Sequence, residues 1–161
     1  MAHFENLSNN KQNFIQQFLD DENLVKCLAN NQPDFLNYEV PDKSSLIYNH
    51  IYPCKYIPQT NETAKAFIAI GFRYDPSASS SRYYRTSYVT FYIFCHSSLI
   101  HTSYGALRYD YALQRVDAIM NCSRSKEWIG QMEFDNAEDD ILDSKGEYVG
   151  ICVSYRSGEI S

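Results

Sequence analysis

The chain has 161 residues, 44% of them hydrophobic, which suits one compact domain with a buried core, and we expect a single domain over residues 1–161. Its net charge of −6 at pH 7 excludes sequence-independent binding to nucleic acid through extensive contacts with the phosphates. No segment approaches the ~20 apolar residues of a membrane span, and the polar N-terminus holds no apolar signal segment, so we expect no membrane association.

The first third of the chain predicts helices followed by a stretch that prolines interrupt. Apolar residues recur at helical spacing over residues 10–29, as one bent helix or two consecutive ones, and Asp20 is a candidate cap for a second helix. Pro33 ends this region, because the residue before a proline is pushed out of the helical conformation. Residues 42–50 favour a short helix. The following stretch to Pro58 must be extended, and we expect it to pack across an edge or a face of a sheet.

Two strands are predicted in the middle of the chain. Residues 64–74 alternate between an apolar face and a face that includes Lys65 and Arg73, which is the period of a half-buried strand. In residues 84–96 the odd positions form an apolar face, and the even positions are nearly as apolar. A strand covered on both faces lies at the centre of its sheet or at an interface. A polar loop at residues 75–81 joins the two strands.

An amphipathic helix and two more strands complete the predicted fold. Residues 105–121 carry apolar side chains along one stripe and polar ones opposite, which is typical of a helix lying on a core. Residues 128–134 and 147–156 are predicted strands with an acidic loop between them. The order predicts an α+β fold: a mainly antiparallel sheet of four or more strands, packed by this amphipathic helix and by the N-terminal helices.

The predicted loop between the last two strands is strongly acidic. Its carboxylates belong to Asp135, Glu138, Asp139, Asp140 and Asp143. The spacing and the missing central glycine do not fit a calcium-binding EF-hand loop. A solvated connection is one interpretation. The other is an acidic surface that faces DNA and lets the polymer pass without sticking.

No residues with a catalytic or metal-binding spacing stand out, so we expect no enzyme, no metal and no cofactor. His96 and His101 are five residues apart, unlike the pair of a helical metalloprotease site. Cys95 cannot pair with His96, because adjacent residues on a strand point to opposite faces. The five cysteines form no CxxC motif, which favours free thiols in a reducing compartment. No cluster of polar residues foretells a ligand pocket.

Three stretches together resemble the tail terminator proteins of tailed bacteriophages that infect Gram-positive hosts. They are LIYNHIYPCKYIP (46–58), VTFYIFCHSSLIHTSYGALRYDYALQRVDAIM (89–120) and EYVGICVSYRS (147–157). The resemblance implies an α+β subunit of a homohexameric ring that caps the tail tube, joins it to the head and has no enzymatic activity. The implied partners are further copies of the chain, the tail tube protein, the head-side connector, and DNA that passes without specific binding. The implied location is the neck of the virion, after assembly in the host cytoplasm.

Within this resemblance, two groups of residues are candidate sites. The hairpin shoulder Arg82, Tyr83, Tyr84 and Arg85 is a candidate docking surface, and the acidic loop is a candidate channel or rim element. A neighbouring subunit would also cover the second apolar face of residues 84–96. The alternatives are another neck ring, such as a head-closure protein, and a non-viral α+β domain that binds a small molecule. Head-closure proteins tend to be smaller and barrel-like, so the predicted helices favour the tail terminator.

Overall fold

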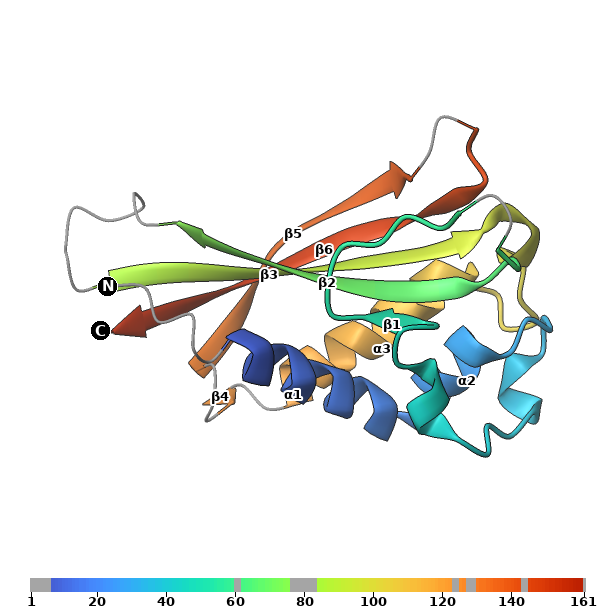
Figure 1. Cartoon of the computed structure of the whole chain (residues 1–161), viewed down its shortest axis with the longest axis horizontal. Coiled ribbons are helices and arrows are strands. Elements are labelled where there is room, and N and C mark those ends of the chain that lie inside the picture. The colour runs from blue at the N-terminus through green and yellow to red at the C-terminus, as the bar shows by residue number, and fades with distance from the viewer. Residues whose placement is uncertain are drawn as a thin grey trace.

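A computed structural model of the chain describes residues 7–59, 62–75, 84–122, 125–126, 130–142 and 145–160. The helices are α1 (Leu7–Asp20), α2 (Glu22–Ala29) and α3 (Arg108–Cys122), with short 3-10 helices at Phe35–Asn37, Lys43–Leu46 and Ser97–Leu99. The strands are β1 (Ile51–Tyr52), β2 (Ala66–Asp75), β3 (Tyr84–His96), β4 (Ser125–Lys126), β5 (Gly130–Ile141) and β6 (Tyr148–Ile160). The three helices lie on one face of the sheet (Figure 1). The predicted α+β fold is confirmed.

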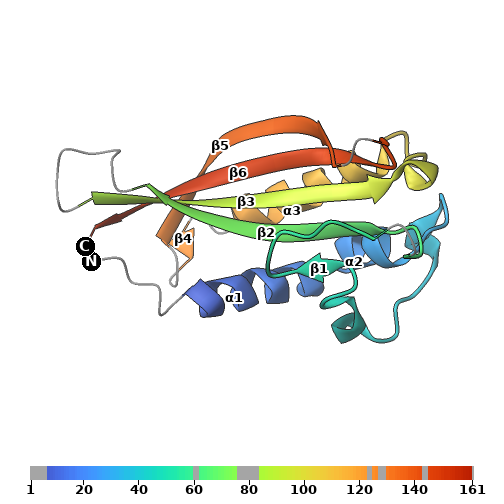
Figure 2. The same ribbon diagram turned by 45° about the horizontal axis from the view of Figure 1, so that its top comes forward.

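The strands form a mainly antiparallel sheet in the order β1-β2-β3-β6-β5-β4. β3 lies at its centre, because it pairs with the whole of β2 on one side and along its full length with β6 on the other. β1 differs in direction, since Ile51 and Tyr52 run parallel to Ile68 and Ala69 of β2. β6 therefore lies between β3 and β5, although it is the last strand in the chain (Figure 2). Residues 84–96, which were expected either at the centre of the sheet or at an interface, lie at its centre.

The first helical region breaks where the sequence provides a cap. α2 starts at Glu22, because the Asp21 side chain accepts a hydrogen bond of 2.9 Å from the backbone N–H of Leu24. The region therefore forms two helices and not one bent helix, and the cap is Asp21 where Asp20 was expected. Arg115 of α3 reaches the same Asp21 carboxylate at 2.6 Å, which ties α3 to the start of α2.

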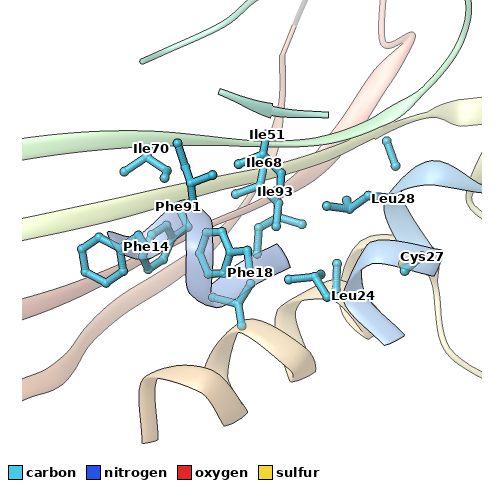
Figure 3. Close-up of a cluster of buried hydrophobic side chains, with 14 of the residues drawn as sticks. Phe14, Phe18, Leu24, Cys27, Leu28, Ile51, Ile68, Ile70, Phe91 and Ile93 are labelled. Atoms are coloured by element: carbon cyan, nitrogen blue, oxygen red, sulfur yellow. The ribbon is translucent and has the colours of Figure 1, made fainter. Parts of the chain in front are cut away.

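The main core lies between the helices and the sheet. Phe14 and Phe18 of α1 are fully buried and meet the ring of Phe91 edge-on, with ring centroids 5.3 and 5.2 Å apart (Figure 3). Alternate residues of β2 and β3 and the apolar stripe of α3 add Ala66, Ile68, Ile70, Val89, Ile93, Cys95, Ala112, Val116 and Met120. Burying one large apolar side chain contributes about 1.5–3 kcal/mol, which is why hydrophobic periodicity decides which face turns inward.

The outer face of the sheet, opposite the helices, is covered over part of its area by the chain itself. Phe67 and Phe94 are buried there in a second cluster with Tyr52 and Tyr148. The segment that follows β1 crosses this part of the sheet (Figure 1). Residues 64–74 were predicted to form a half-buried strand. This prediction is wrong for the first half of β2, which is covered on both faces. The chain itself also provides part of the cover that was expected from a neighbouring subunit.

The acidic connection predicted as a loop is in fact most of strand β5. It pairs with β6 from Met132 to Ile141, with an irregularity between Phe134 and Asn136. Residues 133–141 are exposed, so this part of the strand has no buried face and leaves no apolar alternation in the sequence. Backbone pairing with β6 is sufficient to keep it extended. The strand predicted at residues 128–134 is the beginning of this longer element, and residues 128–129 lie outside the described residues.

Residues 42–50 do not form the predicted α-helix. The Asp42 side chain caps a 3-10 helix that ends at Leu46. Tyr48 then adopts a φ of 64°, in the left-handed region that a right-handed helix cannot use. This turn directs the chain into β1. Of the predicted loop at residues 75–81, only Asp75 is described, and it ends β2.

Candidate functional site

The part of the outer face that the chain leaves open is hollowed. A groove of about 470 Å³, which we call the outer groove, extends across β2, β3, β6 and β5. The strand register places Gly71, Thr90, Ser154 and Asn136 side by side in one row across it. The hydroxyl groups of Thr90 and Ser154 are 2.8 Å apart and share a hydrogen bond. The groove therefore has a polar floor that spans four strands.

Two cations lie over tyrosine rings on the β2 side of the outer groove. The Arg73 guanidinium is 4.3 Å from the ring centroid of Tyr88, and the Lys55 ammonium is 5.6 Å from that of Tyr92. Such cation–π contacts contribute about 0.5–1 kcal/mol at exposed sites. Gly71 leaves room for this arrangement, because a Cβ there would lie 3.1 Å from Cε2 of Tyr92. Positive charge is thus held over β2 and β3.

Carboxylates occupy the opposite, β5 side of the outer face. Glu138 and Asp140 pair with outer-facing positions of β6, so they point to the same side of the sheet as the outer groove. Asp139 lies between them on the other face of β5. The pKa of Asp110 on α3 is raised, mainly by burial and in addition by the negative charge of Asp139. Lys55 and Arg73 thus lie over β2 and β3, and Glu138 and Asp140 lie along β5. Arg156 of β6 is a further cation on this face, 3.6 Å from Glu133 of β5.

Four side chains, which we call the tyrosine clamp, fasten the segment after β1 to the sheet. They are Tyr52, Tyr56, Glu62 and Lys65. The two tyrosine rings stack with centroids 3.8 Å apart, and the Lys65 ammonium lies over both. Lys65 donates a hydrogen bond of 2.5 Å to the Tyr52 hydroxyl and lies 3.2 Å from Glu62, to which Tyr56 also donates. Burial disfavours the charged form of Lys65, but Tyr52 and Glu62 outweigh this effect and raise its pKa.

A second cavity, of about 900 Å³, opens beside the tyrosine clamp. Asn31, Asn49 and His50 line it together with the clamp, and the exposed ring of Tyr48 lies at it too. Nδ1 of His50 is 2.8 Å from the carbonyl oxygen of Ala66, and burial lowers the pKa of His50. No cluster of residues in the sequence foretold this cavity. These residues converge only because the chain folds back over the sheet, and the only sequence signal was the density of tyrosine and polar residues between positions 48 and 65.

The residues of the predicted docking surface are only partly described. Arg82 and Tyr83 lie outside the described residues, and Tyr84 and Arg85 begin β3 with side chains that are likewise outside the description. That site stays a prediction. Asp143 of the acidic group is also not described. The other four acidic residues of that prediction are brought together on β5, as an exposed strand and not as a loop.

Cys95 and His96 point to opposite faces of β3, as expected. Cys95 lies in the main core, where burial raises the pKa of its thiol to about 12. His96 packs edge-on against Tyr148 on the outer face. In the part of the chain that the structure describes, no three His, Cys, Asp or Glu side chains are grouped as a metal site. None of the described helices has the length and apolar character needed to cross a membrane.

The fold and the site define an α+β protein whose sheet is closed by helices on one face and partly open, with divided charge, on the other. The chain belongs to the YomW family, whose model matches residues 21–157. The family carries a gene name of Bacillus phage origin, which points to a phage-related protein. No curated protein and no solved structure matches the chain.

Proposed function

We propose that the chain is a structural protein of a tailed-phage virion: a tail terminator subunit that assembles into a ring, caps the tail tube and joins the tail to the head. Membership of a phage-related family supports the proposal. So does the resemblance of residues 46–58, 89–120 and 147–157 to tail terminators. The antiparallel sheet with helices on one face agrees with the fold that this resemblance implies.

The observation that carries the proposal is the unequal covering of the two faces of the sheet. Helices pack on one face (Figure 2). The outer face keeps a groove bordered by charged side chains. A ring of identical subunits needs two different surface patches that fit each other. The divided charge provides the outer face with two such patches.

In this role the protein works through surface complementarity. One side of the ring matches the end of the tail tube and stops further polymerisation, and the other side matches the head-side connector. DNA passes through the ring without specific binding, which agrees with a net charge of −6. The protein resides in the neck of the virion after assembly in the host cytoplasm, uses no cofactor and catalyses no reaction. A different neck ring, such as a head-closure protein, is the alternative within this class.

The cavity beside the tyrosine clamp favours a second candidate function, the binding of a small molecule. Ligand pockets have volumes of roughly 300–1,000 Å³ and a few converging polar groups. The cavity has about 900 Å³ and brings Asn49, His50 and Lys65 together. A protein with this function would act as a monomer and would not recognise tail tubes.

The mass of the purified protein in solution separates the two candidates. We expect light scattering to find ring-sized particles, or a monomer that binds only to the ends of isolated tail tubes. A monomer that ignores tube ends would contradict the tail terminator. In that case a metabolite screen would test the second candidate. A ligand that raises the melting temperature of the unaltered chain but not of His50→Ala would make small-molecule binding the proposed function.

A further inference from the structure

Among the described residues, two stretches of strand edge on opposite sides of the sheet have no partner strand. β1 pairs with β2 only at Ile68 and Ala69, and no other described strand pairs with the rest of that edge. β4 pairs with β5 only at Gly130 and Gln131, again within the described residues. β2 and β5 lie on opposite sides of β3 and β6 (Figure 2). Unpaired backbone N–H and C=O groups along a strand are a template for pairing with another chain.

The side chains beside the two free edges have opposite charge. Lys55 and Arg73 lie on the outer face near β2, and Glu138 and Asp140 project to the same face from β5. Like charges directly opposite each other destabilise a strand pair, so β5 repels a second β5, and the cations beside β2 repel their own kind. Contact between β5 and β2 is the combination that brings opposite charges together. The pattern thus disfavours two-fold pairing and favours a head-to-tail contact.

Strand direction permits this contact. Each step from β2 to β3, from β3 to β6 and from β6 to β5 is antiparallel, so β5 runs opposite to β2. A second copy placed beside the first in the same orientation therefore presents its β5 antiparallel to the free edge of β2. Antiparallel pairing of this kind continues the sheet from one subunit into the next.

Building on the proposed function, we propose that the subunits of the ring join edge to edge. β5 of one copy pairs with the free edge of β2 in the next copy. The next copy is displaced along the strand direction, so that Glu138 and Asp140 lie against Arg73 and Lys55 and not against Ala69, which β1 already pairs with. The partner of the basic side of the outer groove is thus a second copy of this chain. The acidic strand lies at the boundary between subunits and not on the channel surface. Repetition of the contact closes a ring when the rotation per subunit divides a full turn.

Charge reversal on each edge tests the contact. The basic-edge variant carries Lys55→Glu and Arg73→Glu, and the acidic-edge variant carries Glu138→Lys and Asp140→Lys. We expect each variant alone to need at least about tenfold more protein for half-maximal assembly in light scattering than the unaltered chain, because like charges then meet at every contact. An equimolar mixture of the two variants should form rings that contain both chains. A chain with all four reversals should assemble with itself.

Matched controls separate the contact from net charge. Lys11→Glu with Lys43→Glu changes the charge as much as the basic-edge variant does, but on α1 and a 3-10 helix. Asp139→Lys reverses a charge on the other face of β5. Both controls should assemble like the unaltered chain, and circular dichroism should show native folding in every variant.

The outcomes distinguish the edge contact from the ring itself. If both edge variants assemble alone at the same concentration as the unaltered chain, or if their mixture stays monomeric, the edge-to-edge contact is overturned while the ring proposal stands. If the unaltered chain is a monomer that ignores tail tubes, the proposed function is overturned first.

Discussion

Arg108 is a buried cation that has no carboxylate partner in the part of the chain that the structure describes. Its side chain is 1% exposed. The guanidinium donates hydrogen bonds of 2.7–3.2 Å to the carbonyl oxygens of Cys27, Asn30, Asn31, Gln32 and Leu99. Most of these carbonyls lie at or just after the end of α2, where the helix dipole places negative partial charge. Arg108 thus ties the start of α3 to the end of α2.

Substitution of Arg108 should be costly even when the positive charge is kept. Arg108→Lys should lower the free energy of unfolding by about 2 kcal/mol. An ammonium group has three donors and cannot reproduce the planar arrangement of guanidinium donors that reaches all these carbonyl oxygens. Arg108→Met should lower it by about 3–5 kcal/mol, since several buried carbonyls lose their partner. Urea unfolding followed by circular dichroism measures both, with Lys11→Met as a surface control. Equal stability of Arg108→Lys and the unaltered chain would contradict this role.

His50 should make the fold sensitive to mild acid. Burial, together with the nearby Lys65 ammonium, lowers the pKa of His50 in the folded state, while the unfolded chain takes up the proton at the ordinary pKa of about 6.5. The unfolded state therefore binds more protons below about pH 6.5, and stability is lost as the pH falls through this range. Urea unfolding between pH 7.5 and pH 5.5 should show the loss. In His50→Gln the free energy of unfolding should depend less on pH. If it depends on pH as strongly as in the unaltered chain, another group causes the effect.

At the scale of elements, the close packing of β3 and β6 depends on Gly150. A Cβ at this position would lie 1.9 Å from the carbonyl oxygen of Ile93, which is backbone and cannot move aside without separating the strands. We expect Gly150→Ala to lower the free energy of unfolding by about 3 kcal/mol or more. Gly71→Ala is the matched control, because its Cβ would meet only side-chain atoms, of Tyr92 at 3.1 Å and of Lys55 at 3.7 Å, and it should cost less than about 1 kcal/mol. Similar losses in both variants would contradict the explanation.

Elements with a buried face could be predicted from the sequence, and those without one could not. Residues 84–96 form β3 with the predicted bounds, and alternate side chains from Val89 to Cys95 enter the core. In β5 the exposed run from Glu138 to Asp140 has no such pattern, so its strand character comes from pairing with β6 alone. The outer groove could not be predicted from the sequence either. It combines Lys55, Arg73 and Asp135 from distant segments, and hydrophobic periodicity does not tell which strands become neighbours.

For the whole molecule, the divided charge of the outer face makes ring assembly depend on salt. Electrostatic attraction between exposed groups is screened over about 10 Å at 0.1 M salt and about 3 Å at 1 M. We therefore expect the concentration for half-maximal assembly to rise between these salt concentrations, in light scattering of the unaltered chain. The chain with all four edge charges reversed should respond in the same way. Assembly that does not change with salt would point to a contact made by uncharged surfaces.

The position of β6 has a consequence for synthesis of the protein. β6 is translated after every other described strand, yet it fills the gap between β3 and β5. Until it leaves the ribosome, β3 has one unpaired side and β5 lacks its main partner, so the helices of the N-terminal half meet an incomplete sheet. Long-range strand pairing of this kind is slow and leaves apolar surface open to aggregation. The sheet therefore cannot be completed before β6 has been synthesised, and until then one side of β3 remains open to pairing and aggregation.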